Sequence, residues 1–594
     1  MRTTLRALAV LLGLGFRASP WLYIARSTLA FTGMVGPLLA AFGLRVLVNG
    51  AAGHHLSEAV WGGVLIGLAL TAELSAHIGA TLVVLPQRER MFLALDRRLM
   101  ELTTAIPDLD HVERPQYRDR IQQMRDNQWR LHQALPLVWE SALVAVQFGA
   151  SLIIIARLQP WLLVLPLLGI PGGYLGHKAE KVLNDRWERA SEPDRRARHL
   201  FELLVTADSA KEARVFGMVG LILETYRRTR AEVDRIVNGA MLRQSAYNAA
   251  GFSFIGAGYA VALLLSVAAA AQGKLTVGDV AMVMGLAGGA IGGLSGLVGQ
   301  LSQVRRAMYF AGHYVWLEDH ARTASRQPPH PAPMPDRVRG GIDIDHVTFR
   351  YPGSSVTAVK DVSLHLPPGR VVALVGENGA GKTSLVKLLT RMYAPTEGRI
   401  LLDGTDFQEF DVDALRGRMS AGFQDYARFE LVARETVGVG ELARIEDRTA
   451  VGAAVDRGGA SDVVDGLPDG LESQLGATWE HGIELSGGQW QKLAVARTVM
   501  RETPLLVIFD EPTANIDAQT EHALFERLSA AAQDDEVGGR VTILVSHRFS
   551  TVRMADLIVV LDQGRVIEQG THGELMTHDG VYAELFSIQA RAYL

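Results

Sequence analysis

The sequence contains no cysteine. This absence excludes disulfide bonds, cysteine-ligated zinc, iron–sulfur clusters and any cysteine nucleophile. A marked excess of one charge sign is also missing, because the formal net charge is only -5 over 594 residues. A nucleic-acid partner usually shows as a basic domain or patch, so none is predicted. A chain of this length is too long for one core, and at least two domains are expected.

Charged residues are scarce in long stretches of the first half of the chain. Six apolar runs there are candidates to cross a bilayer, which takes about 20 residues. They cover residues 21–48, 59–85, 134–156, 160–175, 248–271 and 277–301. The fourth run is short, and Pro171-Gly172-Gly173 falls inside its end. We predict an all-α, six-helix transmembrane domain over residues 20–326.

The N-terminal segment 1–19 allows two interpretations. Arg2 and Arg6 precede or border a short apolar run, a pattern that also occurs in signal peptides. No small-residue cleavage site is obvious and a long apolar run follows, which favours an interfacial helix leading into the membrane.

Positive charges between the apolar runs predict their orientation. The segments after the second and fourth runs are rich in Lys and Arg, whereas the other connections hold few. Both termini and these two long segments are therefore expected on the cytoplasmic side of a plasma membrane. Structureless loops of such length are improbable, so we predict helical arms with tips near residues 108–117 and 206–217.

Proline is concentrated in residues 327–335, which predicts an extended linker over 327–340. Apolar strand-like runs then alternate with helical patterns. This alternation predicts a mainly parallel α/β core over residues 341–594. The motif at Gly376–Thr383 makes this predicted unit an α/β P-loop ATPase domain.

The segment Gly376–Thr383 reads GENGAGKT and matches a phosphate-binding loop. An apolar run, 371–375, precedes it and an amphipathic helix follows, which is the context that the motif requires. Backbone N–H groups at the helix start would hold phosphates. Lys382 would contact the β- and γ-phosphates of ATP, and the Thr383 hydroxyl would bind Mg²⁺.

A second apolar run, 505–509, is typical of a strand buried on both faces. It brings Asp510 and Glu511 to its carboxyl end, where ligands bind in such sheets. Asp510 suits the Mg²⁺ shell, and Glu511 suits the base that acts on the attacking water.

The motif Leu485-Ser486-Gly487-Gly488-Gln489 resembles the signature of ATP-binding cassette (ABC) transporters, and residues 508–513 resemble their Walker B strand. Six spans and a C-terminal cassette on one chain resemble an exporter-type half-transporter. The resemblance implies a dimer in which ATP lies between two cassettes.

The resemblance also implies residue roles. Glu511, His547 and Lys382 would be catalytic, and Thr383, Gln424 and Asp510 would hold the metal. Tyr351 would stack on adenine, Asp517 lies in the loop that crosses between cassettes, and Ser486 and Gly488 would bind the ATP of the partner. The nucleotide-binding set is Tyr351, Gly376, Asn378, Gly379, Gly381, Lys382, Thr383, Ser384, Gln424, Ser486, Gly487, Gly488, Gln489 and Asp517.

Three positions depart from the commonest family pattern: Trp490 after the signature, Thr436 after Gln424, and Trp479 before Glu480. None is a phosphate ligand. We expect them to alter the coupling surface rather than hydrolysis.

Glu73 and His77 lie four positions apart in the second apolar run, hence on one helical face. A carboxylate inside a bilayer is costly. The pair either lines a cavity for a cationic or polar substrate or forms a Glu–His hydrogen bond within the bundle, and the second interpretation is favoured. Glu140 in the third run has the same two interpretations.

These observations predict ATP-driven export of an amphipathic, peptide-like or drug-like substrate, using ATP and Mg²⁺. The partner would be a second half-transporter, in a homodimer or a heterodimer. An importer on the exporter fold and an ATP-using regulatory membrane protein remain alternatives. The six apolar runs exclude a soluble P-loop ATPase for DNA repair or translation.

Overall fold

The structure is a computed structural model that describes residues 6, 9, 13, 16–126, 128–164, 167, 169–325, 328–511, 526 and 539–592. The chain forms two compact units. The helical unit comprises Met1–Leu102 and Arg120–Asp319, and the C-terminal unit comprises Thr103–Asp119 and His320–Leu594. The short segment Thr103–Asp119 is thus part of the C-terminal unit.

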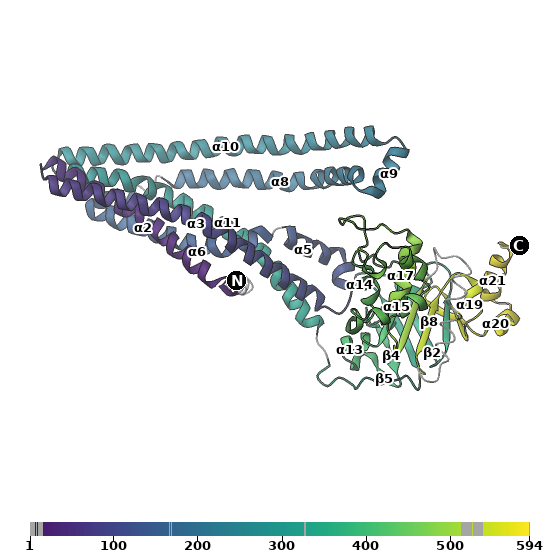
Figure 1. The fold of residues 1–594 in the computed structure, drawn as a ribbon. Helices are drawn as coiled ribbons and strands as arrows, with labels where there is room; N and C mark the ends of the chain where they lie inside the picture. Colours follow the sequence, from purple (N-terminus) through teal and green to yellow (C-terminus); the bar gives the residue numbers. More distant parts are fainter. Residues whose placement is uncertain are drawn as a thin grey trace. The chain divides into compact units, whose positions relative to one another are not determined.

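Long helices make up the helical unit, and α8 and α10 run side by side along their length (Figure 1). The helices that form it or lead out of it are α2 (Pro20–Ala52), α3 (Leu56–Thr104), α5 (Pro115–Asp126), α6 (Gln128–Leu158), η1 (Pro160–Val164), α8 (Ile170–Val205), α9 (Ala207–Val215), α10 (Val219–Ala271) and α11 (Val277–Ala324).

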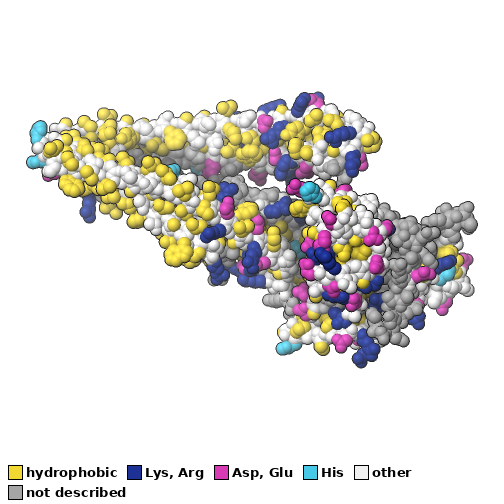
Figure 2. Space-filling model, in the orientation of Figure 1, with side chains coloured by type: hydrophobic (Ala, Val, Ile, Leu, Met, Phe, Trp, Pro, Cys, Tyr) yellow, Lys and Arg dark blue, Asp and Glu magenta, His cyan; other side chains and the backbone are white. Residues whose placement is uncertain are grey.

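Four helices in the described part of the chain are long and apolar enough to cross a membrane. They are Pro20–Ala52, Leu56–Thr104, Leu137–Leu158 and Val219–Ala271, and Val277–Ala287 is a shorter apolar stretch. Figure 2 shows hydrophobic side chains over these helices and charged side chains gathered at the α9 end of α8 and α10. This separation matches helices that leave an apolar layer and continue into water.

The fourth predicted span, 160–175, differs from the structure. A 3₁₀ turn covers Pro160–Val164, and α8 begins only at Ile170, with Pro171 in its first turn. Proline lacks an N–H donor and is favoured at a helix start, which fits the position of Pro171 in the first turn of α8.

The predicted helical arms are confirmed by the helix bounds. Helix α3 continues to Thr104, and α8 and α10 extend far beyond the predicted apolar runs. Short helices lie at both predicted tips: α4 (Asp110–Glu113) and α9.

Two sheets form the frame of the C-terminal unit. A six-stranded sheet has the order β10-β9-β3-β8-β7-β6, and a four-stranded sheet has the order β2-β1-β4-β5. The strands are β1 (Ile342–Arg350), β2 (Thr357–Leu366), β3 (Val371–Val375), β4 (Glu397–Leu402), β5 (Thr405–Asp406), β6 (Met419–Gly422), β7 (Leu506–Asp510), β8 (Val541–Val545), β9 (Leu557–Asp562) and β10 (Arg565–Gly570).

Helices flank these sheets, so the predicted α/β P-loop domain is confirmed. They are α12 (Lys382–Leu389), η2 (Phe407–Glu409), α13 (Val412–Arg416), α14 (Ala433–Gly438), η3 (Leu442–Arg444), α15 (Arg448–Arg457), α16 (Ser461–Asp465), η4 (Gly470–Glu472), α17 (Gly487–Thr498), α19 (Phe549–Val552), α20 (His572–His578) and α21 (Val581–Ala592).

Strands β3, β8, β7 and β6 are neighbours and run parallel. Every residue of β3, β7 and β8 is buried, which explains their uninterrupted apolar sequences. The carboxyl ends of parallel strands meet at one edge of a sheet. The loops after these four strands therefore converge.

The proline-rich segment lies against the C-terminal unit. The backbone N–H of Ala332 donates to the carbonyl of Glu409 (2.8 Å), and Arg418 donates to the carbonyl of Asp336 (2.6 Å). The segment is thus fixed at its described end rather than free.

Candidate ATP site

The loop between β3 and α12 has a backbone that only glycine adopts easily. Gly376, Gly379 and Gly381 have φ values of 149°, 86° and 104°. A Cβ on Gly376 would stand 2.1 Å from the carbonyl oxygen of Leu561. The glycines therefore let the loop curl tightly and leave its N–H groups accessible to an anion.

Lys382 lies inside this loop. Its Nζ donates to the carbonyls of Gly376 (2.6 Å) and Glu377 (3.0 Å). Burial lowers the pKa of Lys382, and the nearby carboxylates of Glu511 and Asp510 oppose that shift. A buried ammonium held by neutral carbonyls is well placed to bind phosphate oxygens. Thr383 and Asn378 are exposed beside it.

Tyr351 is held next to the start of α12. Its hydroxyl shares a hydrogen bond with the Ser384 hydroxyl (3.1 Å), and its ring contacts Phe349 and Tyr393 at centroid distances of 4.8 and 5.4 Å. Lys387 Nζ lies 5.4 Å from the centre of the Tyr351 ring. The predicted adenine-stacking residue is thus fixed beside the phosphate-binding loop.

Three predicted residues meet at the carboxyl edge of the six-stranded sheet. Gln424 Nε2 donates to Glu511 Oε2 at 2.8 Å. His547 Nε2 lies 2.6 Å from Glu511 Oε1. Gln424 follows β6, Glu511 follows β7 and His547 follows β8. Both oxygens of one carboxylate are therefore oriented by side chains from the neighbouring strand ends.

Glu511 has a strained backbone. Its φ is 50°, which is unfavourable for a residue with a side chain, and its N–H donates to the carbonyl of Val545 (2.9 Å). Such strain costs on the order of 1–3 kcal/mol and persists where the surroundings enforce it. The bond to β8 is one of the contacts that hold this residue in place, beside those of its carboxylate to Gln424 and His547.

Asp510 is 2% exposed, and its carboxylate has no hydrogen-bond partner among the described residues. Burial raises its pKa to about 6, the adjacent Glu511 adds to the shift, and Lys382 opposes it. A buried carboxylate beside a phosphate-binding loop fits a divalent cation. The Thr383 hydroxyl and the Gln424 amide are further oxygen donors of the kind that Mg²⁺ accepts. The residues present therefore suit Mg²⁺.

The signature motif forms the start of α17. Ser486 caps the helix: its side chain accepts from the N–H of Gln489 (3.3 Å), and the Gln489 side chain accepts from the N–H of Ser486 (2.9 Å). A Cβ on Gly487 would meet nothing within 4 Å. This helix N-terminus is therefore open to the close approach of an anion. Gly488 is the second residue of the helix, and Asp517 lies outside the described residues.

Two of the three unusual positions are core residues. Trp490 and Thr436 are each 2% exposed, and Trp490 packs in the apolar core that α14, α15 and α17 share. Neither side chain reaches the surface, and their expected effect on a coupling surface stays a prediction. Trp479, 55% exposed, and Glu480 do lie at the surface.

The tip of the first arm is bound to this unit by residues that the sequence did not identify. Glu113 of α4 accepts from Lys387 Nζ (2.7 Å) and from the Tyr393 hydroxyl (2.6 Å). Burial would raise the pKa of Glu113, but these two donors together lower it. Lys387 also lies over the Tyr351 ring. It therefore contacts both α4 and the residue predicted to stack on adenine.

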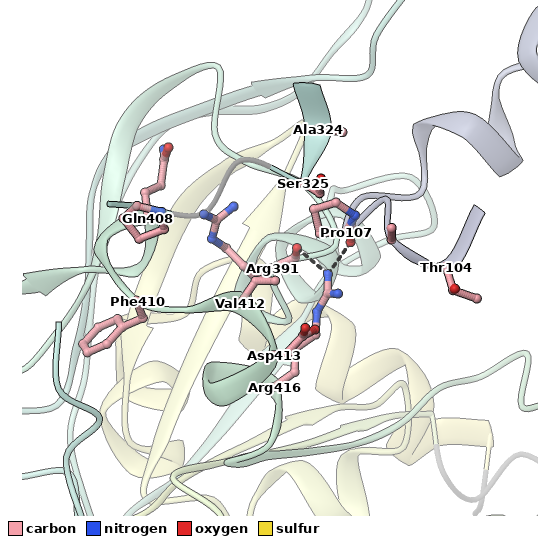
Figure 3. A pocket seen from close by; sticks show the side chains of 12 residues that line it. Thr104, Pro107, Ala324, Ser325, Arg391, Gln408, Phe410, Val412, Asp413 and Arg416 are labelled. Atoms are coloured by element: carbon pink, nitrogen blue, oxygen red, sulfur yellow. Dashed lines mark hydrogen bonds between the residues drawn. The ribbon is translucent and has the colours of Figure 1, made fainter. Parts of the chain in front are cut away.

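Arg416 strengthens the same attachment. Its guanidinium donates to the carbonyls of Pro107 and Arg391, the latter at 2.8 Å, and it lines a cavity of about 320 Å³ with Arg391, Thr104 and others (Figure 3). The sequence held one signal for this contact, the helix-breaking pattern near residues 108–117, but no indication of its partners.

Residues 359–514 match the family model described as ABC transporter. The chain carries an ABC transporter cassette. The match covers the phosphate-binding loop, Gln424, the signature and the Asp510-Glu511 pair, so the cassette reported by the model is the unit that the geometry above describes. ATP binding follows as the property of this domain.

Proteins similar to this chain include two named ATP-dependent lipid A-core flippase. The one from Ralstonia nicotianae is 41% identical over 256 residues, 43% of this chain and 42% of that protein. The one from Xanthomonas oryzae pv. oryzae is 35% identical over 389 residues, 65% of this chain and 63% of that protein. The chain thus matches less than two thirds of the length of either relative.

The whole fold resembles that of a bacterial Atm1-family ABC exporter solved with ATP bound. The TM-score is 0.79 at 24% identity, and the alignment covers 96% of this chain and 98% of the other. The predicted combination of a helical membrane unit and an ABC cassette on one chain is therefore confirmed. The predicted role of each site residue stays a prediction.

Proposed function

We propose that this chain is one half of a dimeric, ATP-driven exporter of a lipid-like amphiphile in a plasma membrane. The observation that carries the proposal is the carboxylate of Glu511, held on both oxygens by Gln424 and His547 next to a phosphate-binding loop. The same chain has helices of membrane-spanning length, and ATP hydrolysis would drive the movement of a substrate between them.

The proposed chemistry assigns a task to each group. Lys382 and the loop N–H groups hold the phosphates of ATP. Glu511 orients or deprotonates the attacking water, and His547 fixes that carboxylate and faces the γ-phosphate. Mg²⁺, when bound at Asp510, Thr383 and Gln424, would neutralise phosphate charge. These assignments rest on side chains that already lie within one strand-end cluster.

The proposal includes a second cassette. Ser486 and the open helix start at Gly487 present an anion-binding surface whose ligand, in the proposed dimer, is the ATP bound by the partner chain. The partner is a second half-transporter, either another copy of this chain or a related chain. Both termini and the cassette lie in the cytoplasm in this proposal.

A lipid-like substrate is narrower than the amphipathic, peptide-like or drug-like class expected from the sequence. It is supported by relatives that carry the name lipid A-core flippase.

The test uses the full-length chain in proteoliposomes that contain a fluorescent lipid-like amphiphile without a phosphate group. ATP added outside should move fluorescence away from the leaflet facing the exposed cassettes, as shown by quenching with a membrane-impermeant reductant. Glu511→Gln should abolish the movement, whereas Glu397→Gln, on the exposed surface of β4, should not. Movement toward the cassette side would instead support an importer, and hydrolysis without movement would support a regulator.

A further inference from the structure

A cavity of about 640 Å³ lies in the helical unit and is lined by residues of α2, α3 and α6. Apolar side chains make up most of its wall, including Leu29, Leu70 and Leu74. Three ionisable side chains also line it: Glu73 and His77 from α3, and Glu140 from α6. Its volume is within the range of about 300–1,000 Å³ that small-molecule sites occupy.

The two carboxylates in this cavity differ in their partners. Glu140 is paired, because Arg26 Nη2 lies 2.6 Å from its Oε1. The same guanidinium donates through Nη1 to Gln87 (3.2 Å). Glu73 has neither a hydrogen bond nor an ion pair within the described residues. One negative charge in the cavity is therefore neutralised and the other is not.

The hydrogen bond between Glu73 and His77 that the sequence favoured is not formed in the described part of the chain. Both side chains line the cavity, and the ring of His77 has no partner there either. Gly36 of α2 leaves room for the stem of Glu73, since a Cβ at that glycine would stand 3.0 Å from Glu73 Cβ. The helix contact thus accommodates a carboxylate that pairs with no side chain in the described part of the chain.

Glu73 lies near the middle of the apolar run 59–85, where water is scarce and an unpaired carboxylate is costly. A ligand that brings a positive charge removes this cost. A phosphate group would increase it, because two anions would then share a cavity with low dielectric walls.

We propose that this cavity binds an amphiphile that carries a protonated amine. The ammonium group donates to Glu73, the His77 ring is a second polar group beside it, and the alkyl chain packs on the leucine-rich wall. This inference rests on the proposed export function and defines its substrate class. It sets this chain apart from a carrier that selects its lipid through anionic groups.

The test uses three additives with the same twelve-carbon chain at equal low micromolar concentrations: dodecylamine, dodecyl sulfate and dodecanol. ATP hydrolysis by the full-length chain in lipid nanodiscs should rise with dodecylamine and not with the other two. Glu73→Gln should raise the half-stimulating concentration of dodecylamine about ten-fold or more, about 1.4 kcal/mol, because a charge-assisted bond is lost. Glu73→Asp should restore most of the response.

The matched control is Glu89→Gln, which removes an exposed carboxylate from the same helix outside the cavity and should respond like the wild type. Equal stimulation by dodecyl sulfate, or an unchanged dodecylamine response in Glu73→Gln, overturns the amine site.

A second measurement does not depend on how the variants fold. A diazirine-bearing dodecylamine should label the wild-type chain in segments 29–33 and 70–80, and unlabelled dodecylamine should compete while dodecyl sulfate should not. Labelling spread evenly over all apolar helices, or absent from these segments because another chain covers them, overturns the proposal.

The two hypotheses fail in different ways. Hydrolysis that requires Glu511 but ignores dodecylamine overturns the amine site and leaves the proposed transporter intact. Hydrolysis that does not require Glu511 overturns the proposed function itself.

Discussion

At the scale of single residues, two glycines of one loop respond differently to an added methyl group. Gly376 has a φ of 149° and no space, because a Cβ would stand 2.1 Å from a backbone oxygen. Gly379 has a φ of 86°, but a Cβ there would meet nothing within 4 Å. The first glycine is required for the fold of the loop, and the second leaves open space on its outer side.

Gly376→Ala should therefore destabilise the cassette more than Gly379→Ala. Strain at a positive φ costs on the order of 1–3 kcal/mol, and only Gly376→Ala adds a clash with β9 that the backbone must move to relieve. Thermal unfolding of the full-length variants without nucleotide checks this order. Equal unfolding temperatures, or a lower one for Gly379→Ala, would contradict the account.

The residue scale is also where the sequence was most informative. Lys382, Asp510 and Glu511 belong to motifs whose chemistry requires those side chains at that spacing, so they could be identified without a structure. The pairing of Glu511 with both Gln424 and His547 depends on the order of β6, β7 and β8, which no local pattern encodes. The burial of Trp490 could not be predicted either. It directly follows the signature motif, and the local sequence does not show that its side chain packs in the core shared by α14, α15 and α17.

At the scale of elements, helix α4 is attached to the cassette by long-range contacts. Glu113 and Lys387 are 274 positions apart in the chain. The sequence predicted where the arm would turn, since prolines and capping residues act locally. It could not predict what the turn would contact, because a contact over such a separation is set by the fold of both elements.

Glu113→Gln should loosen α4. The Glu113 carboxylate accepts from both Lys387 and Tyr393, but it is 37% exposed, so its charge is partly screened by water. The attachment of α4 to the cassette should therefore lose only about 1 kcal/mol of stability, which is roughly a five-fold change in the equilibrium for local opening of α4. Hydrogen exchange of the amides of residues 110–117 in the full-length chain measures it, with Glu397→Gln as the control. Unchanged exchange would show that other contacts, such as Arg416 to Pro107, suffice.

The pKa shift of Glu113 predicts how pH acts on this attachment. Its pKa is lowered in the folded state, so its contribution is fully present above the ordinary carboxyl pKa and is lost as pH falls through the lowered value. Exchange of the α4 amides, corrected for its intrinsic pH dependence, should thus show constant protection at neutral pH and weaker protection only in acid.

At the scale of the whole molecule, the account joins an ATP-hydrolysing cassette to a membrane unit on one chain. A single cassette binds ATP at its phosphate-binding loop. It leaves without a ligand the anion-binding surface at Ser486, which lies at the start of α17 and not in that loop. Two chains, each giving its signature to the ATP of the other, would use both surfaces. The membrane unit was predictable in outline from its apolar runs, and its polar residues gave a cavity as one of two interpretations. Which of the two holds depends on the packing of three helices, which no local pattern encodes.

The most direct test of the central claim is ATP binding and hydrolysis by the full-length Glu511→Gln variant in lipid nanodiscs, beside the wild type and Glu397→Gln. Loss of a general base typically costs about 10²–10⁴ in rate. The account predicts ATP bound as in the wild type, hydrolysis reduced at least about 100-fold, and a control that hydrolyses normally. Hydrolysis by Glu511→Gln within a few-fold of the wild-type rate would contradict it.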